Sequence, residues 1–130
     1  MKVRNTGTIF AFNITDEHMQ KLNKAAGRSG LRLRVVLEED QGKPLYKIAG
    51  LSAPAAEDSA EPPAPFADEM IVMHSLSEAD LNQFLIALRH EELSIPYKAI
   101  LTPTNMNWFP GALITELRRE HEAMQKTMKQ

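Results

Sequence analysis

The sequence of 130 residues predicts an α+β fold. We expect two tandem strand–helix–strand units that form a ferredoxin-like antiparallel sheet with both helices on one face, followed by an extra C-terminal helix. Two segments share a pattern 62 positions apart, a stretch rich in proline and alanine separates them, and an amphipathic stripe follows the second. These observations predict an N-terminal unit over residues 1–51, a linker over 52–67 and a C-terminal unit over 68–130.

The internal repeat aligns residues 9–14 with residues 71–76 without a gap. Thr15 and Ser77 follow at matching positions, and a hydroxyl in this place is typical of a helix N-cap. Apolar residues then recur with the helical period of 3.6 in both copies. They are Met19, Leu22 and Ala26 in the first copy, and Leu81, Phe84, Leu85 and Leu88 in the second.

An extended segment is expected after each helix. In the first unit Leu31, Leu33 and Val35 alternate with arginines, which indicates a strand buried on one face. In the second unit residues 97–101 are almost continuously apolar and predict another strand. A short strand over residues 45–49 is expected to pair with residues 33–37 through a turn at 40–43.

The linker over residues 52–67 contains four prolines, many alanines and scattered acidic residues. It has little apolar surface to bury, which favours a flexible linker. The alternative is an extended strap in which Phe66 docks on the body. The length of the linker would let the two units pack within one chain or exchange with a second chain.

The composition is typical of a soluble globular protein, with 43% hydrophobic and 25% charged residues. Cysteine is absent, which excludes disulfides, thiol catalysis and thiolate metal sites, and is compatible with the cytoplasm. No apolar region predicts a signal peptide, and no run approaches the roughly 18 residues that span a bilayer. We therefore expect a cytoplasmic protein with no membrane partner.

The net charge of −2 is unevenly distributed. Residues 1–36 carry +5, residues 37–69 carry −6 and residues 70–130 carry −1. The basic first unit either meets an anionic partner or is complemented by the acidic segment that follows. Nucleic acid, bound through Arg28, Arg32 and Arg34, is not the expected partner, because interleaved aromatic residues are missing and the sequence pI is about 6.1.

The loop over residues 102–110 is the candidate ligand-binding site. It gathers hydroxyl, amide and aromatic side chains at the start of a predicted helix, a combination suited to a small polar or anionic group. The candidate residues are Thr102, Thr104, Asn105, Asn107 and Trp108. The structural alternative is that the asparagines close turns and the tryptophan fills the core.

The C-terminal helix is predicted to begin near Pro110, which suits a first helical turn. Its apolar stripe covers the core, the other unit or a partner chain, so a homodimer through this helix is one expectation. The stripe consists of Leu113, Leu117, His121, Met124 and Met128. His121 is interpreted either as a catalytic base or, preferably, as a hydrogen-bonded core residue. His18 and His74 have no second ligand at metal spacing, so neither a metal nor a cofactor is expected.

Residues 69–124 resemble a bacterial family catalogued only as a domain of unknown function. The resemblance rests on the strand over 71–74, the capped helix over 77–88, and the sequence Thr102-Pro103-Thr104-Asn105 followed by Trp108. A helix with a Leu-x-x-Glu pattern over 113–122 completes it. The resemblance implies no reaction, cofactor or ligand. The first unit departs from it, since residues 38–40 stand where the loop would be.

These observations favour a non-enzymatic module that binds a small ligand or another protein. The first alternative is a small hydrolase-like or transferase-like enzyme that uses the 102–110 loop and His121. No activated nucleophile, acid–base pair or metal set is readable to support it, and no catalytic residue is assigned. The second alternative is nucleic-acid binding through the basic first unit.

Overall fold

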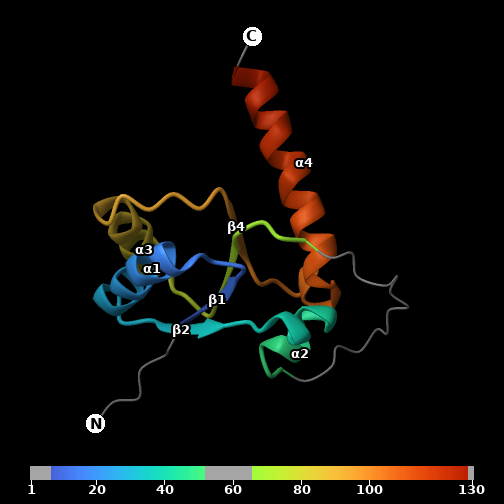
Figure 1. Cartoon of the computed structure of the whole chain (residues 1–130), viewed down its shortest axis with the longest axis horizontal. Helices are drawn as coiled ribbons and strands as arrows, with labels where there is room; N and C mark the ends of the chain where they lie inside the picture. Colours follow the sequence, from blue (N-terminus) through green and yellow to red (C-terminus); the bar gives the residue numbers. More distant parts are fainter. Residues whose placement is uncertain (1–6, 52–65, 129–130) are drawn as a thin grey trace.

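A computed structural model describes residues 7–51 and 66–128, with side chains as far as residue 125. A four-stranded sheet lies between two layers of helices (Figure 1). The elements are, in order, β1 (Thr8–Phe12), α1 (Asp16–Arg28), β2 (Arg32–Val35), the 3₁₀ helix η1 (Glu38–Gly42), α2 (Leu45–Ile48), β3 (Met70–His74), α3 (Glu78–His90), β4 (Tyr97–Ile100), the 3₁₀ helix η2 (Asn105–Asn107) and α4 (Pro110–Met128).

The strands of the sheet follow the order β2-β1-β3-β4. β1 pairs with β2 in parallel, β3 pairs with β4 in parallel, and β1 and β3 run antiparallel. The expected α+β class is therefore observed, whereas the antiparallel ferredoxin-like sheet is not confirmed, because the sheet is mixed. The mixed sheet arises because α1 and α3 each return the chain to the position next to the preceding strand. The two strands of each unit therefore pair with one another in parallel.

Both expected N-caps are present. The Thr15 hydroxyl accepts a hydrogen bond from the His18 amide at 3.3 Å, and the Ser77 hydroxyl accepts one from the Asp80 amide at 3.0 Å. Each bond satisfies an amide that has no partner in the first helical turn. α1 and α3 have the same length, and their bounds lie 62 positions apart.

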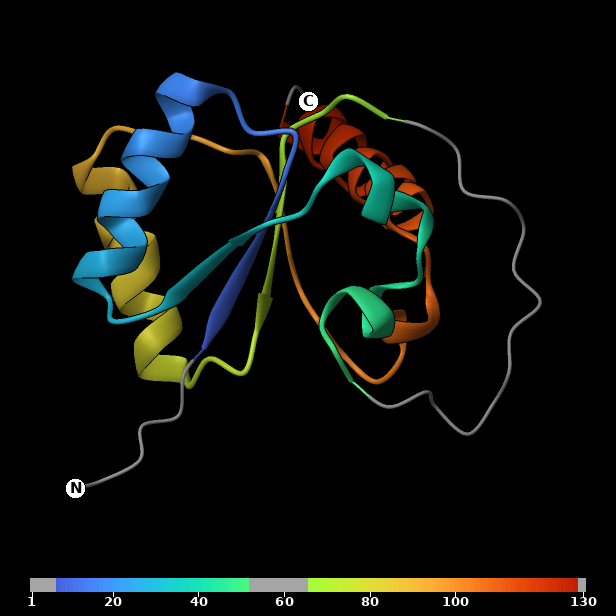
Figure 2. The same ribbon diagram turned by 60° about the horizontal axis from the view of Figure 1, so that its bottom comes forward.

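α1 and α3 cover one face of the sheet and contact each other, as expected (Figure 2). The side chains between these helices and the sheet form the first core. Its buried members are Ile9, Ala11, Leu22, Ala25, Ile71, Met73, Phe84, Ala87, Leu88, Leu93 and Ile95.

The opposite face of the sheet is covered by α2 and α4, which lie together on the other side in Figure 2. This second core consists of Phe10, Phe12, Val36, Leu45, Met70, Val72, Leu113 and Ile114. β1 and β3 contribute alternate residues to the two cores, so both strands are buried on both faces. This explains why their sequences are continuously apolar rather than alternating.

The predicted short strand at residues 45–49 is wrong. Residues 38–42 form η1 in place of a hairpin turn, and α2 occupies Leu45–Ile48 after the N-cap residue Pro44. The Leu45 amide donates to the Trp108 carbonyl at 2.9 Å, and its side chain is buried in the second core. Burial against α4 and η2 therefore decides the conformation of this segment.

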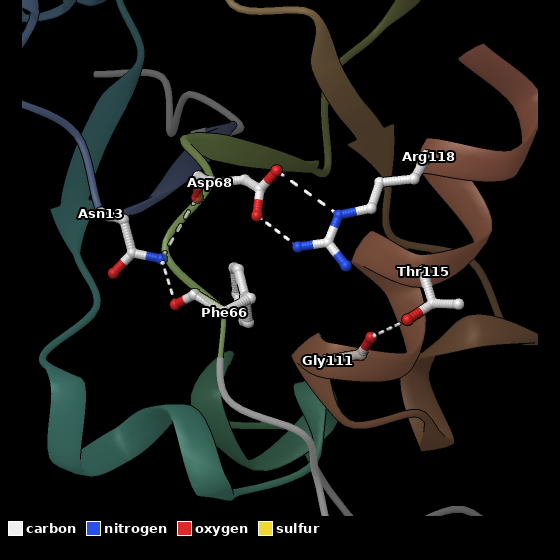
Figure 3. Close-up of polar contacts among 6 residues, drawn as sticks. All are labelled: Asn13, Phe66, Asp68, Gly111, Thr115 and Arg118. Carbon is white, nitrogen blue, oxygen red and sulfur yellow. Dashed lines mark hydrogen bonds and ion pairs between the residues drawn. The ribbon is translucent and has the colours of Figure 1, made fainter. Parts of the chain in front are cut away.

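Residues 66–69 dock on the body before β3 begins. The Phe66 and Phe12 ring centres lie 6.3 Å apart. The side-chain amide of Asn13 donates to the carbonyls of Phe66 and Asp68 at 3.2 and 3.1 Å (Figure 3). Asn13 has a φ of 58°, a conformation that asparagine tolerates better than most residues. Phe66 thus makes the contact that the strap alternative expected, while residues 52–65 of the predicted linker lie outside the described residues.

Two carboxylates extend this docking contact. Asp68 forms an ion pair with Arg118 of α4 through two hydrogen bonds (Figure 3). In one of them the Arg118 Nε donates to the Asp68 Oδ2 at 3.4 Å. Glu69 accepts the Thr15 amide at 3.0 Å and lies 2.8 Å from Nδ1 of His18. We call Asn13, Asp68, Glu69 and Arg118 the clasp, because they tie the start of β3 to α1 and α4.

The C-terminal half of α4 extends beyond the sheet (Figure 1). Leu113 and Ile114 near its start are buried, whereas Met124 is 63% exposed. The homodimer expected through this helix stays a prediction. Within residues 7–51 and 66–128, none of the helices has the length and apolar character needed to cross a membrane.

Replacing Asn13 by glycine tests the clasp. Glycine keeps the positive φ but removes three hydrogen bonds, two donated by the Asn13 side chain and one accepted from Gln41, so we expect a loss of about 1–3 kcal/mol in the free energy of unfolding. The control is Glu92→Gly at another positive φ, which should change stability by less than about 1 kcal/mol. Urea denaturation measures both. Equal effects would show that the Asn13 amide does not stabilise the fold.

The Asp68–Arg118 pair predicts a dependence of stability on pH. Hydrogen bonding from Arg118 holds the pKa of Asp68 below its ordinary value. A lowered pKa contributes stability above the unfolded-state value of about 3.9, and this contribution disappears as the pH falls through the folded-state pKa. Asp68→Asn should therefore destabilise at pH 7 and converge with the unmodified protein in acid. In the control, Asp68→Asn/Arg118→Met is compared with Arg118→Met by urea denaturation. The difference in their free energies of unfolding should not depend on pH in this way, because the ion pair is already absent.

Candidate functional site

The predicted loop joins β4 to α4 and is organised around Asn105. This residue is only 9% exposed. Its Oδ1 accepts the Thr102 amide at 2.8 Å, and its Nδ2 donates to the Ile100 carbonyl at 3.0 Å. The Asn105 amide in turn donates to the Thr102 hydroxyl at 3.1 Å. The polar atoms of Asn105 thus fold the loop onto the end of β4.

Trp108 connects the same loop to the second core. Its side chain is half-buried and packs against that core. Its amide donates to the Asn105 carbonyl at 2.9 Å, and its carbonyl accepts the Leu45 amide. Trp108 therefore fixes the loop, the start of α4 and α2 relative to one another.

The five candidate ligand-binding residues do not all face one space. Thr102, Asn105 and Trp108 line a common hollow beside β4, whereas Thr104 and Asn107 are not among its lining residues. Thr104 is exposed at the start of η2. The ligand-binding role of the five residues stays a prediction.

The hollow beside β4 has a volume of about 480 Å³, within the range of ligand sites. We call it the edge groove. It is bounded by α3 on one side, by β4 and the 102–108 loop along its floor, and by α4 on the other side. Its lining residues are Met73, Leu81, Leu85, Lys98, Ala99, Ile100, Thr102, Asn105, Trp108, Leu113, Glu116, Leu117 and Glu120.

β4 lies at the end of the strand order, with β3 as its neighbour. The Leu101 amide donates to the Met73 carbonyl of β3 at 2.8 Å, so the peptide groups of Lys98 and Ile100 point to the opposite side of β4, where no strand of the described residues pairs. The Ile100 carbonyl confirms this direction, since it accepts the bond from Asn105. The edge groove therefore exposes backbone groups of a strand together with apolar side chains.

The charged residues of the edge groove are arranged asymmetrically. The Lys98 ammonium group donates to the Ile95 carbonyl at 2.7 Å, and burial lowers the pKa of this lysine. Glu116 and Glu120 lie four residues apart on α4, and therefore on one face of it. Glu116 also forms an exposed ion pair with Arg119 at 3.0 Å.

His121 contacts an aromatic ring and an amide. Its ring meets Tyr97 edge-on with a centroid distance of 5.7 Å, and its Nε2 lies 3.2 Å from the Gln125 amide nitrogen. The Tyr97 contact is between the two rings, and the Gln125 side chain is a neutral amide, so neither contact is the hydrogen bond to a nucleophile or carboxylate that activates a catalytic histidine. Among the described residues, no group of three or more His, Asp or Glu side chains could hold a metal ion.

The arginines of the first unit lie at the other end of the sheet. Arg32 and Arg34 belong to the outer strand β2, and the Arg34 guanidinium lies 5.6 Å from the centre of the Phe10 ring. Arg28 approaches Glu91 at 3.9 Å. Arg34 thus packs on the body of the protein, and Arg28 has an acidic neighbour.

Sequence reasoning missed the residues that give the edge groove its character, namely Lys98, Ile100, Glu116 and Glu120. Leu81 and Leu85 were recognised only as helix-face residues. The spacing of Glu116 and Glu120 was readable as one helical face. The position of β4 at a sheet edge was not, because strand order is a tertiary property.

Comparison with known families agrees with the resemblance seen in the sequence. A family model described as "Domain of unknown function (DUF3783)" matches residues 69–124. Every residue that lines the edge groove falls within this range. No curated protein and no solved structure matches the chain significantly.

Replacing the two loop asparagines separates a structural role from a ligand role. Asn105→Ala removes two partly buried hydrogen bonds and should lower the free energy of unfolding by about 1–3 kcal/mol. Asn107→Ala, in the same loop, should change it by less than about 0.5 kcal/mol. Urea denaturation at neutral pH measures both. An Asn105→Ala protein as stable as the unmodified chain would contradict the structural role.

Proposed function

We propose that this protein is a non-enzymatic interaction module that binds an extended segment of a partner protein in the edge groove. The observation that carries the proposal is a sheet edge that lies open between two helices and is flanked by apolar side chains. An extended segment can add to such an edge as a further strand, in which backbone bonds supply affinity and side-chain pockets supply specificity.

The backbone geometry of β4 supports this mode of binding. The amide and carbonyl of Lys98 and the amide of Ile100 point away from β3. Asn105 already occupies the Ile100 carbonyl, which favours the stretch before residue 100 for pairing. A short added strand would therefore align along β4 and end at the loop.

The side chains around β4 supply apolar contact. Ile100 is 49% exposed although it belongs to a strand, and Leu85 of α3 and Leu117 of α4 line the same groove. Covering such surface yields about 25 cal/mol for each Å² removed from water. The half-buried indole of Trp108 adds an aromatic anchor of the type that dominates many interfaces.

The loop chemistry gives less support to the other functions considered. Asn105 directs its side-chain donor and acceptor into its own loop, so the polar atoms of the central residue in the predicted ligand site already have partners. His121 contacts the Tyr97 ring and the neutral Gln125 amide, and neither contact is a hydrogen bond to a nucleophile or carboxylate. A strand-binding role uses the features that the edge groove does possess.

Substituting the exposed apolar residue of each outer strand tests the proposal. Ile100→Lys places a charge in the edge groove, and Val35→Lys is its matched control on β2, where the valine is 56% exposed. Random nine-residue peptides displayed on phage are selected against the full chain, and the selected peptides are titrated by fluorescence anisotropy. We expect Ile100→Lys to raise Kd at least about tenfold and Val35→Lys less than about twofold.

Hydrogen exchange gives a second readout of the same binding. The amides of Lys98 and Ile100 should gain protection when a selected peptide binds, because they become donors in a new ladder. Peptides that bind without protecting these amides, or whose binding ignores Ile100→Lys, would contradict strand addition at β4.

A further inference from the structure

We infer that the segment held in the edge groove is an amphipathic strand, with aliphatic side chains on its face toward α3 and lysine or arginine on its face toward α4. The inference rests on the proposed function and specifies the chemistry of the partner. It follows from the different lining of the two sides of the groove.

The two sides are assigned by the register of the sheet. Lys98 and Ile100 pair with Ile71 and Met73, which belong to the first core and face α3. Ala99 packs against the second core and therefore faces α4. Because side chains alternate along a strand, an added strand continues the same two faces.

The side toward α3 is apolar. Met73, Leu81, Leu85 and Ile100 line it, and Ile100 is half exposed. Lys98 also lies on this side, but its ammonium group is held by the Ile95 carbonyl. A cationic partner side chain would lose hydration beside the Lys98 ammonium group, and an anionic one would have to compete with the Ile95 carbonyl for it, so aliphatic residues fit this face best.

The side toward α4 is apolar at its base and acidic at its rim. Ala99 and Leu117 form the base, while Glu116 and Glu120 stand one helical turn apart above it. A lysine or arginine can lay its methylene groups on the base and bring its charge to the carboxylates. Arg119 also forms an ion pair with Glu116. The Arg119 side chain is 69% exposed, however, and such an exposed ion pair is weak.

Two synthetic peptides test the inference on the full chain. Both have nine residues; one alternates valine with lysine and the other alternates valine with glutamate. Fluorescence anisotropy measures their affinities at low and at about 0.15 M ionic strength. We expect the lysine peptide to bind at least about tenfold more tightly, and the double variant Glu116→Gln/Glu120→Gln to remove most of this preference.

A matched variant controls for net charge. Glu38→Gln/Glu39→Gln removes two exposed carboxylates from η1, outside the edge groove, and should change the lysine-peptide affinity less than about twofold. An equal loss in both double variants would overturn the inference, because it would reveal unspecific attraction. Equal binding of both peptides would overturn the inference but leave the proposed function standing.

The remaining outcomes separate the two proposals. If neither peptide binds and phage selection yields no peptide that depends on Ile100, both the proposed function and the inference fail. If sedimentation velocity instead shows a dimer that Ile100→Lys converts to a monomer, the occupant is a second copy of this chain, which overturns the inference.

Discussion

The antiparallel pairing of β1 and β3 is the contact on which the rest of the structure depends. Each strand belongs to a different unit, and the five-residue register between them joins the two halves of the chain. Ile9, Phe12, Met70 and Ile71 are completely buried, so the pair needs apolar cover on both faces. α1 and α3 cover one face, and α4 with α2 must cover the other. The C-terminal helix is therefore part of the core, which a two-unit fold alone would leave open.

Placing β1 and β3 at the centre makes β2 and β4 the outer strands. An outer strand has unpaired backbone groups that can pair with a strand of another chain. The two outer strands of this sheet differ in the side chains that oppose such pairing. β2 carries Arg32 and Arg34, charged residues that discourage association. β4 instead lies between α3 and α4 and ends in exposed Ile100. This difference between the two edges is the reason for proposing β4, and not β2, as the strand that pairs with a partner.

Sequence patterns identified the local elements better than their assembly. The caps at Thr15 and Ser77 and the strand–helix–strand order follow from side-chain chemistry within a few residues, and they were predictable. The parallel pairings were missed, because strand order depends on where each helix returns the chain. The prediction of a strand at residues 45–49 is wrong, because the Leu45 amide donates to the carbonyl of Trp108, a residue far away in the sequence. The loop is contiguous in the sequence and so could be predicted as a candidate site. The edge groove beside it could not, because its lining residues come from separate elements.

Asn105 joins the structural and the proposed functional role of the loop at one atom, the Ile100 carbonyl. By accepting the bond from Asn105 on the outer side of β4, this carbonyl anchors the turn that leads into α4. The same turn places Glu116 and Leu117 opposite α3 and so creates the second wall of the groove. The loop therefore has a reason for its unusual residues that requires no ligand of its own. It builds the wall, and β4 supplies the surface on which a partner strand would pair.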